Sequence, residues 1–196
     1  MVDRNPPTFL VVGHPRGATG YMAALFQHYG YDVGHELMGK NGISAWQYAV
    51  QGVPTKYNPP RNYSATAFDY IVHVVRNPWD TFVSCAFTED SLHLREPHLF
   101  AKGLERAEVE LLSIPRWHRL CDSCAPHLTV KAESAASRLP LWLENLGLRR
   151  PTVGYPPAMT ENTRPHESRE RERYEFDRSI WEEFEEAVSM WEELPS

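Results

Sequence analysis

The residues best suited to chemistry lie in a short loop near the start of the chain. Residues 14–20 read His-Pro-Arg-Gly-Ala-Thr-Gly. They separate an apolar, β-branched run at 8–13 from apolar residues at helical spacing that end at Gly30. In a strand–loop–helix unit of this kind, the unpaired N–H groups and the dipole of the helix favour an anion. The loop therefore predicts a phosphate site, to which Arg16 and Thr19 add donors.

A second basic position follows a later apolar run. Residues 69–75 read Asp-Tyr-Ile-Val-His-Val-Val and predict a buried strand, and Arg76 stands at its end. Ser84 follows eight residues later, in a helix that we expect to begin at Pro78 because proline suits the first turn of a helix. An arginine and a serine in these positions predict a second phosphate site.

Strands and helices alternate along the chain, which predicts an α/β fold of three layers, α/β/α, with a central parallel sheet. The expected strands cover 8–13, 31–36, 69–75 and 128–130. After the first helix, the expected helices cover 43–50, 78–87, 99–120 with a break near Pro115, 140–148, and a last helix that opens on a capping box at Ser179 and Glu182. Ligands of such sheets bind at the carboxyl ends of the strands, where both candidate phosphate sites begin.

Size and composition predict one domain over residues 1–196. A chain of 196 residues buries enough surface for a core, and no apolar run approaches the length of a membrane span. The first residues lack the features of a signal peptide, so we expect a cytoplasmic protein with no membrane partner. The net charge of −6 argues against nucleic acid as a partner. Residues 161–196 alone carry −7, and we expect this acidic segment to end in a packed amphipathic helix.

Two histidines and two cysteines raise the question of a metal site. His118, Cys121, Cys124 and His127 follow one another at three-residue intervals, and these residue types bind zinc. The equal spacing turns the four side chains around a helix instead of gathering them on one face. We therefore expect half-buried helix residues here and no bound metal.

Together the two loop motifs resemble those of sulfotransferases that use 3′-phosphoadenosine 5′-phosphosulfate (PAPS). The 5′-phosphosulfate loop of that family typically reads Pro-Lys/Arg-Ser-Gly-Thr-Thr, and this chain has Pro-Arg-Gly-Ala-Thr-Gly over 15–20. The 3′-phosphate motif of the family is an arginine after a strand, then Asp/Asn-Pro, then a serine, as in Arg76-Asn-Pro through Ser84. The segment Val-Gly-His-Glu over 33–36 also looks like the region in which some members carry a glutamate as general base.

The resemblance implies in-line transfer of a sulfuryl group from PAPS to a hydroxyl or amine, without a metal, leaving 3′-phosphoadenosine 5′-phosphate (PAP). Arg16 would face the bridging and sulfuryl oxygens, and Arg76 and Ser84 would hold the 3′-phosphate. Glu36 would take the proton of the acceptor, and His35 is the second candidate for this role. The 5′-phosphate would lie against the loop and the start of the helix: Gly17, Ala18, Thr19, Gly20 and Tyr21.

The chain also departs from the family pattern. Gly17 and Gly20 stand where the family has hydroxyl residues, and the late Arg-Lys-Gly loop of many members is missing. We expect Asn162 and Arg164 to cover the 3′-phosphate in its place. The acceptor, whether small molecule, glycan or peptide, and the oligomeric state are not specified by these motifs.

Two other classes of function stay open. A kinase or nucleotide hydrolase of the P-loop type needs a lysine and a magnesium-binding hydroxyl at the end of the loop, and this loop has neither. A non-catalytic nucleotide-binding module is the other class. It is consistent with the short chain and with the loss of the loop hydroxyls that the sulfotransferase family has. Magnesium-independent binding of PAP would separate the sulfotransferase from the P-loop enzymes.

Overall fold

A computed structural model describes residues 6–49, 67–86, 104–148, 152, 154–159 and 176–196. The strands are β1 (Phe9–Gly13), β2 (Val33–His35), β3 (Gly42–Ser44), β4 (Tyr70–Val75) and β5 (Leu128–Lys131). The α-helices are α1 (Thr19–His28), α2 (Pro78–Ala86), α4 (Arg106–Ser123), α5 (Ala135–Asn145) and α6 (Arg178–Glu193). Short 3₁₀ helices, η1 (Trp46–Ala49) and η3 (Ala132–Ser134), follow β3 and β5.

The five strands form one sheet in the order β2-β3-β1-β4-β5, and every neighbouring pair is parallel. β1 is the central strand, and its five residues are all buried because both faces of the sheet are covered. β2 and β3 lie on one side of β1, and β4 and β5 lie on the other side. In open α/β sheets, such a change of direction marks the crevice at the carboxyl ends where ligands bind.

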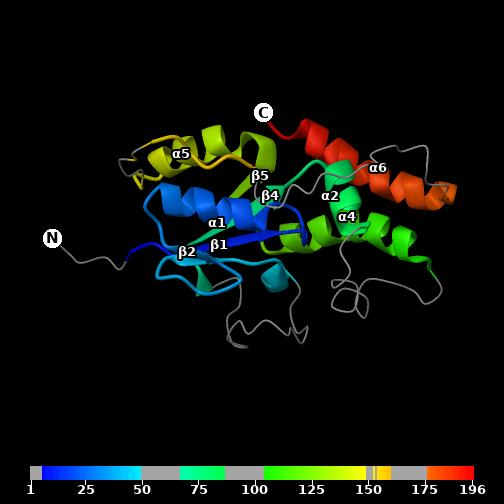
Figure 1. The fold of residues 1–196 in the computed structure, drawn as a ribbon, viewed down its shortest axis with the longest axis horizontal. Helices are drawn as coiled ribbons and strands as arrows, with labels where there is room; N and C mark the ends of the chain where they lie inside the picture. Colours follow the sequence, from blue (N-terminus) through cyan, green and yellow to red (C-terminus); the bar gives the residue numbers. More distant parts are fainter. Residues whose placement is uncertain (1–5, 50–66, 87–103, 149–151, 153, 160–175) are drawn as a thin grey trace.

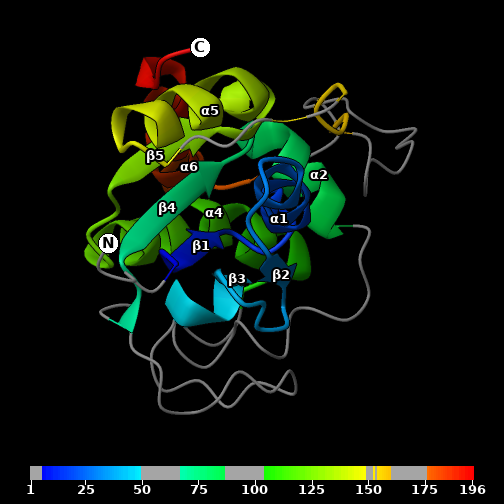
Figure 2. The same ribbon diagram turned by 90° about the vertical axis from the view of Figure 1, so that its left-hand side faces the viewer.

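Helices cover both faces of the sheet, which confirms the three-layer α/β/α prediction (Figure 1 and Figure 2). α1 and α5 lie on one face, where Val11 and Val72 join Leu139 in one apolar cluster. α4 and η1 lie on the other face, where Leu10 and Val12 pack with Trp117. A third cluster joins α2, α4 and α6 and contains Phe82, Leu111 and Phe184.

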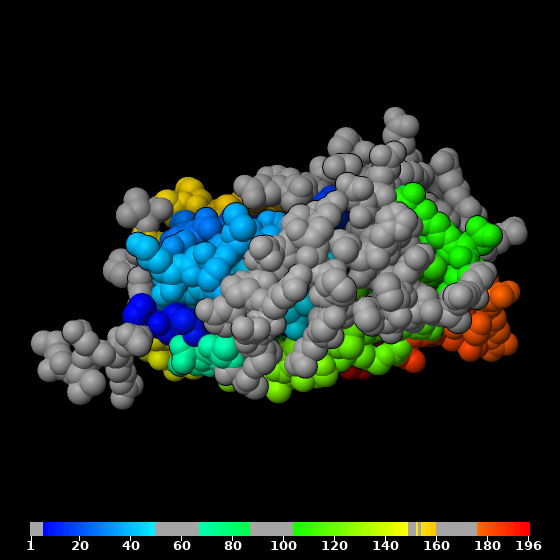
Figure 3. Space-filling model, turned by 90° about the horizontal axis from the view of Figure 1, so that it is seen from below, coloured from blue at the N-terminus to red at the C-terminus, as the bar shows by residue number. Residues whose placement is uncertain are grey.

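Ion pairs as well as apolar contacts connect α6 to α4. These helices lie side by side at one end of the molecule (Figure 3, green and orange). Arg116 on α4 donates two hydrogen bonds of 2.8 Å to the Glu183 carboxylate on α6. Arg119 pairs with the same carboxylate and with Glu186 at 2.6 Å. The amphipathic helix expected at the end of the acidic segment is therefore packed on α4 and α2.

Replacing Glu183 by glutamine should lower stability in a pH-dependent way. The hydrogen bonds from Arg116, followed by those from Arg119, lower the pKa of Glu183 below 4.5 despite partial burial. A lowered pKa in the folded state contributes stability above the pKa of the unfolded state, and this stability is lost as pH falls through the folded value. Urea unfolding at neutral pH should show a loss of about 1 kcal/mol.

The difference between wild type and Glu183→Gln should then vanish at pH values below the lowered pKa. Glu193→Gln is the matched control, because Glu193 is exposed near the end of the same helix. An unchanged difference across this pH range would contradict the ion-pair explanation.

Three expectations about the elements are wrong, and the helix expected over 140–148 instead covers Ala135–Asn145. Within the expected helix over 43–50, residues 43–49 form the end of β3 and the 3₁₀ helix η1 instead, and residue 50 lies outside the described ranges. α4 runs through Pro115 without a break, because buried neighbours such as Leu111 and Ile114 hold the helix in place where one backbone hydrogen bond is missing. The Ser179 capping box is absent, since α6 begins after Asp177 and Glu182 pairs with Arg178 instead.

The expected helix over 99–120 is confirmed from Arg106 onward, and residues 99–103 lie outside the described ranges. Within those ranges no helix has both the length and the apolar character needed to cross a membrane.

Candidate functional site

The loop between β1 and α1 is shaped by two close backbone contacts. A Cβ on Gly13 would lie 2.8 Å from the carbonyl oxygen of Val74, so only glycine fits beside β4 at this point. The N–H of Gly17 donates to the carbonyl of His14 at 2.7 Å, and a Cβ on Gly17 would lie 2.7 Å from the same oxygen. Gly17, one of the glycines of the predicted phosphate loop, is thus required for the tight turn that leads into α1.

Backbone strain is concentrated around this loop. Arg16, Ala18 and Glu36 have positive φ angles of 71°, 75° and 56°. In the described ranges only one other non-glycine residue, Ala125, shares this conformation. Such conformations cost about 1–3 kcal/mol each and persist where the surrounding structure enforces them, often at ligand sites. Three of the four strained positions belong to residues that the sequence predicted for function.

The N-terminus of α1 presents backbone donors to the loop. The first hydrogen bond of the helix runs from the N–H of Met22 to the carbonyl of Ala18 at 3.1 Å. The N–H groups of Thr19, Gly20 and Tyr21 precede this bond, and Ala18 at the N-cap has no side-chain acceptor for them. Together with the helix dipole, these donors favour an anion above the loop.

The structure brings the two predicted motifs together. Arg16 donates from Nε to the Ser84 hydroxyl at 3.1 Å, and Arg76 donates from Nη1 to the carbonyl of Arg16 at 3.3 Å. Arg76 stands where β4 ends, and Ser84 lies on the inner face of α2. Two guanidinium groups and a hydroxyl therefore meet beside the start of α1.

Arg76 has unused hydrogen-bonding capacity. Its Nε is buried and has no acceptor, and among the described residues no carboxylate pairs with its guanidinium. A buried cationic donor without an acceptor is costly, and an anion in the crevice would remove that cost. This is the clearest indication of a ligand in the described part of the molecule.

His35 is the last residue of β2 and Glu36 follows it, but their side chains face different neighbours. The exposed His35 ring places Nε2 3.4 Å from the Thr19 hydroxyl, and its Cε1 lies 3.3 Å from where a Cβ on Gly20 would be. The Glu36 carboxylate accepts a hydrogen bond from the Trp46 indole at 3.1 Å. His35 therefore lies against the loop, and Glu36 lies toward η1.

Tyr21 contributes to the site only through its backbone. Its side chain is buried between α1 and the sheet, where burial and the neighbouring Tyr29 raise the pKa of its hydroxyl. Thr19 is held from the other side, because the Ser44 hydroxyl donates to its carbonyl at 2.7 Å. The sequence contained no signal for this contact, which depends on the pairing of β3 with β1.

Two further anchors of the loop were missed by the sequence analysis. The side chain of His14 is fully buried, and its Nδ1 bonds to the carbonyl of Pro15. Its Nε2 lies 2.8 Å from the Ser113 hydroxyl on α4. The Cys85 thiol donates to the same Pro15 carbonyl at 3.7 Å. The only sequence signal for the role of His14 was its position as a polar residue directly after a buried strand. No sequence signal indicated that Ser113 would contact the loop.

The candidate zinc residues serve other contacts. The Nδ1 of His118 lies 2.9 Å from Nε2 of His73, whose Nδ1 pairs with Asp122 at 3.0 Å. The pKa of His118 lies well below its usual range, mainly because the side chain is buried. The neighbouring His73 and His14 lower this pKa further. Burial likewise raises the pKa of the Cys121 thiol. In the described ranges no three His, Cys, Asp or Glu side chains form a group that could hold a metal ion.

Asn162 and Arg164, expected to cover the 3′-phosphate, lie outside the described residues. No protein-family model matches the chain, and no curated protein matches its sequence.

Proposed function

We propose that the chain is a PAPS-dependent sulfotransferase that transfers a sulfuryl group to a hydroxyl or amine acceptor. The observation that carries the proposal is Arg76, whose guanidinium has no carboxylate partner among the described residues and lies beside the uncapped start of α1. A cofactor with phosphates at both ends of a nucleoside would use both features. The sequence motifs supply the resemblance, and the contacts between Arg16, Arg76 and Ser84 support it.

In this proposal the chain acts mainly by positioning and by stabilising charge. The N–H groups of residues 19–21 hold the 5′-phosphate, and Arg76 and Ser84 hold the 3′-phosphate. Arg16 exchanges its hydrogen bond with Ser84 for the oxygens on which negative charge develops as the bond to sulfur breaks.

The acceptor oxygen or nitrogen forms a bond to sulfur while the bridging oxygen leaves with PAP, and the acceptor proton passes to a base. Glu36 is the base that the resemblance implies, but its carboxylate already accepts the Trp46 N–H. His35 lies against Thr19 and Gly20, next to the expected sulfuryl position. The geometry therefore favours His35 as the proton acceptor and Glu36 as a group that positions the segment.

Isothermal titration calorimetry with PAP tests the proposal. We expect PAP to bind without magnesium and about 100-fold more tightly than adenosine 5′-phosphate, which lacks the 3′-phosphate. The absence of PAP binding would refute the proposal. Magnesium-dependent turnover of ATP would favour the P-loop enzymes in its place.

A further inference from the structure

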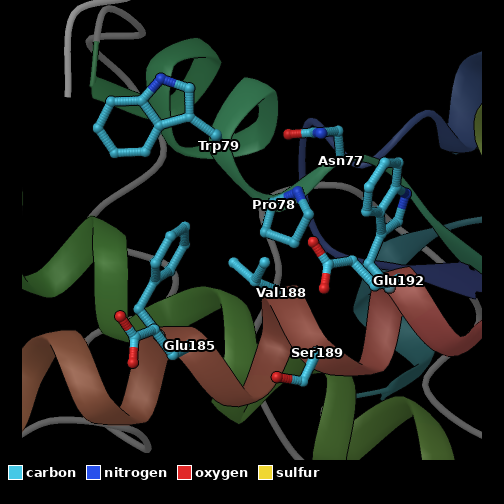
Figure 4. Close-up of a pocket in the computed structure, with 9 residues that line it drawn as sticks. Asn77, Pro78, Trp79, Glu185, Val188, Ser189 and Glu192 are labelled. Carbon is cyan, nitrogen blue, oxygen red and sulfur yellow. The ribbon is translucent and has the colours of Figure 1, made fainter.

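A pocket of about 400 Å³ lies between the start of α2 and the last turns of α6. Its volume falls in the range of small-molecule sites, about 300–1,000 Å³. The walls are mainly apolar and aromatic, and Figure 4 shows them converging from the two helices. The lining consists of Asn77, Pro78, Trp79, Phe184, Glu185, Val188, Ser189, Trp191 and Glu192.

One carboxylate bridges the two walls of this pocket. Glu133, which follows β5, accepts a hydrogen bond from the backbone N–H of Asn77 at 2.9 Å. Its other oxygen accepts the indole N–H of Trp191 at 3.3 Å. The same side chain thus holds the start of α2 and the aromatic wall contributed by α6, so the pocket is a supported feature of the described fold.

The charges around the pocket are mostly negative. Glu185 and Glu192 belong to the lining, which contains no basic residue, and Figure 4 shows the Glu192 carboxylate turned toward Pro78 and Val188. Glu133 adds a third carboxylate behind Trp191. The last turn of α6 contributes no basic side chain of its own.

Trp191 already contacts one cation. The ammonium of Lys131 lies 4.5 Å from the centre of the Trp191 ring and donates to the carbonyl of Glu192 at 3.4 Å. It is the basic group that these contacts place beside Trp191, next to the carboxylates of Glu133 and Glu192. Aromatic faces attract cations, and do so most strongly where water is partly excluded.

We propose that this pocket binds an apolar ammonium group, of the alkylated or quaternary class. The apolar walls would take the alkyl groups, the Trp191 indole would face the diffuse positive charge, and Glu192 would supply the counter-charge. A phosphate or carboxylate would be repelled by the same carboxylates. The pocket adjoins the 3′-phosphate motif at Asn77 and Pro78, but Arg16, Arg76 and Ser84, which would contact PAPS, are not among its lining residues.

Choline and its neutral isostere 3,3-dimethyl-1-butanol form the test pair, because they share a shape and differ in charge. The readout is the indole N–H signals of Trp79 and Trp191 in ¹H–¹⁵N NMR spectra of the full chain. Trp142, which packs against Phe9 and Tyr70 on the opposite face of the sheet, is the internal reference. We expect choline, and not the neutral alcohol, to shift the Trp79 and Trp191 signals in a saturable way.

Glu192→Gln should weaken choline binding about fivefold, because it removes the counter-charge in the pocket. Glu193→Gln, which removes the same charge one residue away and outside the lining, should change the affinity less than twofold. Equal binding of choline and the alcohol would overturn the proposal, since apolar burial alone would then fill the pocket. Shifts caused by PAP and not by choline would overturn it as well.

Discussion

Arg76→Ala should reduce the affinity for PAP about 100-fold, because a charge-assisted contact to the 3′-phosphate is lost. The same substitution should leave the weaker binding of adenosine 5′-phosphate nearly unchanged. Arg76→Lys should give an intermediate loss, since an ammonium keeps the charge but not the planar, multiple donors of a guanidinium. Calorimetry with both nucleotides on the three proteins measures the coupling between Arg76 and the 3′-phosphate directly.

The matched control is Arg178→Ala, because Arg178 is 92% exposed and, in the described part of the chain, forms an ion pair only with Glu182 on its own helix. It should bind PAP as the wild type does. If Arg76→Ala weakened PAP and adenosine 5′-phosphate equally, the loss would come from distortion of the loop, whose Arg16 carbonyl Arg76 contacts. The assignment of Arg76 to the 3′-phosphate would then be wrong.

Gly42→Ala should destabilise the domain by about 3 kcal/mol or more. Gly42 has a φ angle of 122°, and a Cβ there would lie 1.9 Å from the carbonyl oxygen of Phe9 in the neighbouring strand. Because the contacted atom is backbone of the central strand, no side chain can move aside. Urea unfolding followed by circular dichroism should show the loss as a lower transition midpoint.

Gly147→Ala separates the effect of space from the effect of conformation. Gly147 also has a positive φ angle, 69°, but a Cβ there would meet nothing within 4 Å. Its substitution should cost only about 1 kcal/mol, the strain of a left-handed residue. Equal losses at both positions would show that the approach of β3 to β1 is not tight.

Much of the fold followed from patterns in the sequence. The continuous apolar runs at 8–13 and 69–75 correspond to β1 and β4, because a strand buried on both faces consists mainly of apolar residues. The elements that differed were decided by packing. Pro115 stays inside α4 because its surroundings are buried, and η1 replaces a helix where the chain turns after β3.

The candidate site divides in the same way. Local sequence was enough to single out Arg16, Arg76 and Ser84 as candidates, because the two arginines follow recognisable strands and Ser84 lies in the helix that follows the second. The distance between them was not in the sequence, since it depends on β1 and β4 being neighbours in the sheet. The same holds for Ser113, which reaches the loop only because α4 packs beneath it.

The choice between His35 and Glu36 is the sharpest example. Their order in the sequence determined that two proton acceptors stand at the end of β2. Which of them meets the loop was decided by the tertiary structure, because His35 lies against Thr19 and Glu36 is held by Trp46 from η1. The sequence by itself determined the types of groups and the strands that carry them, since these depend on local composition and periodicity. Only the packing of distant elements decided which groups lie within hydrogen-bonding distance of each other.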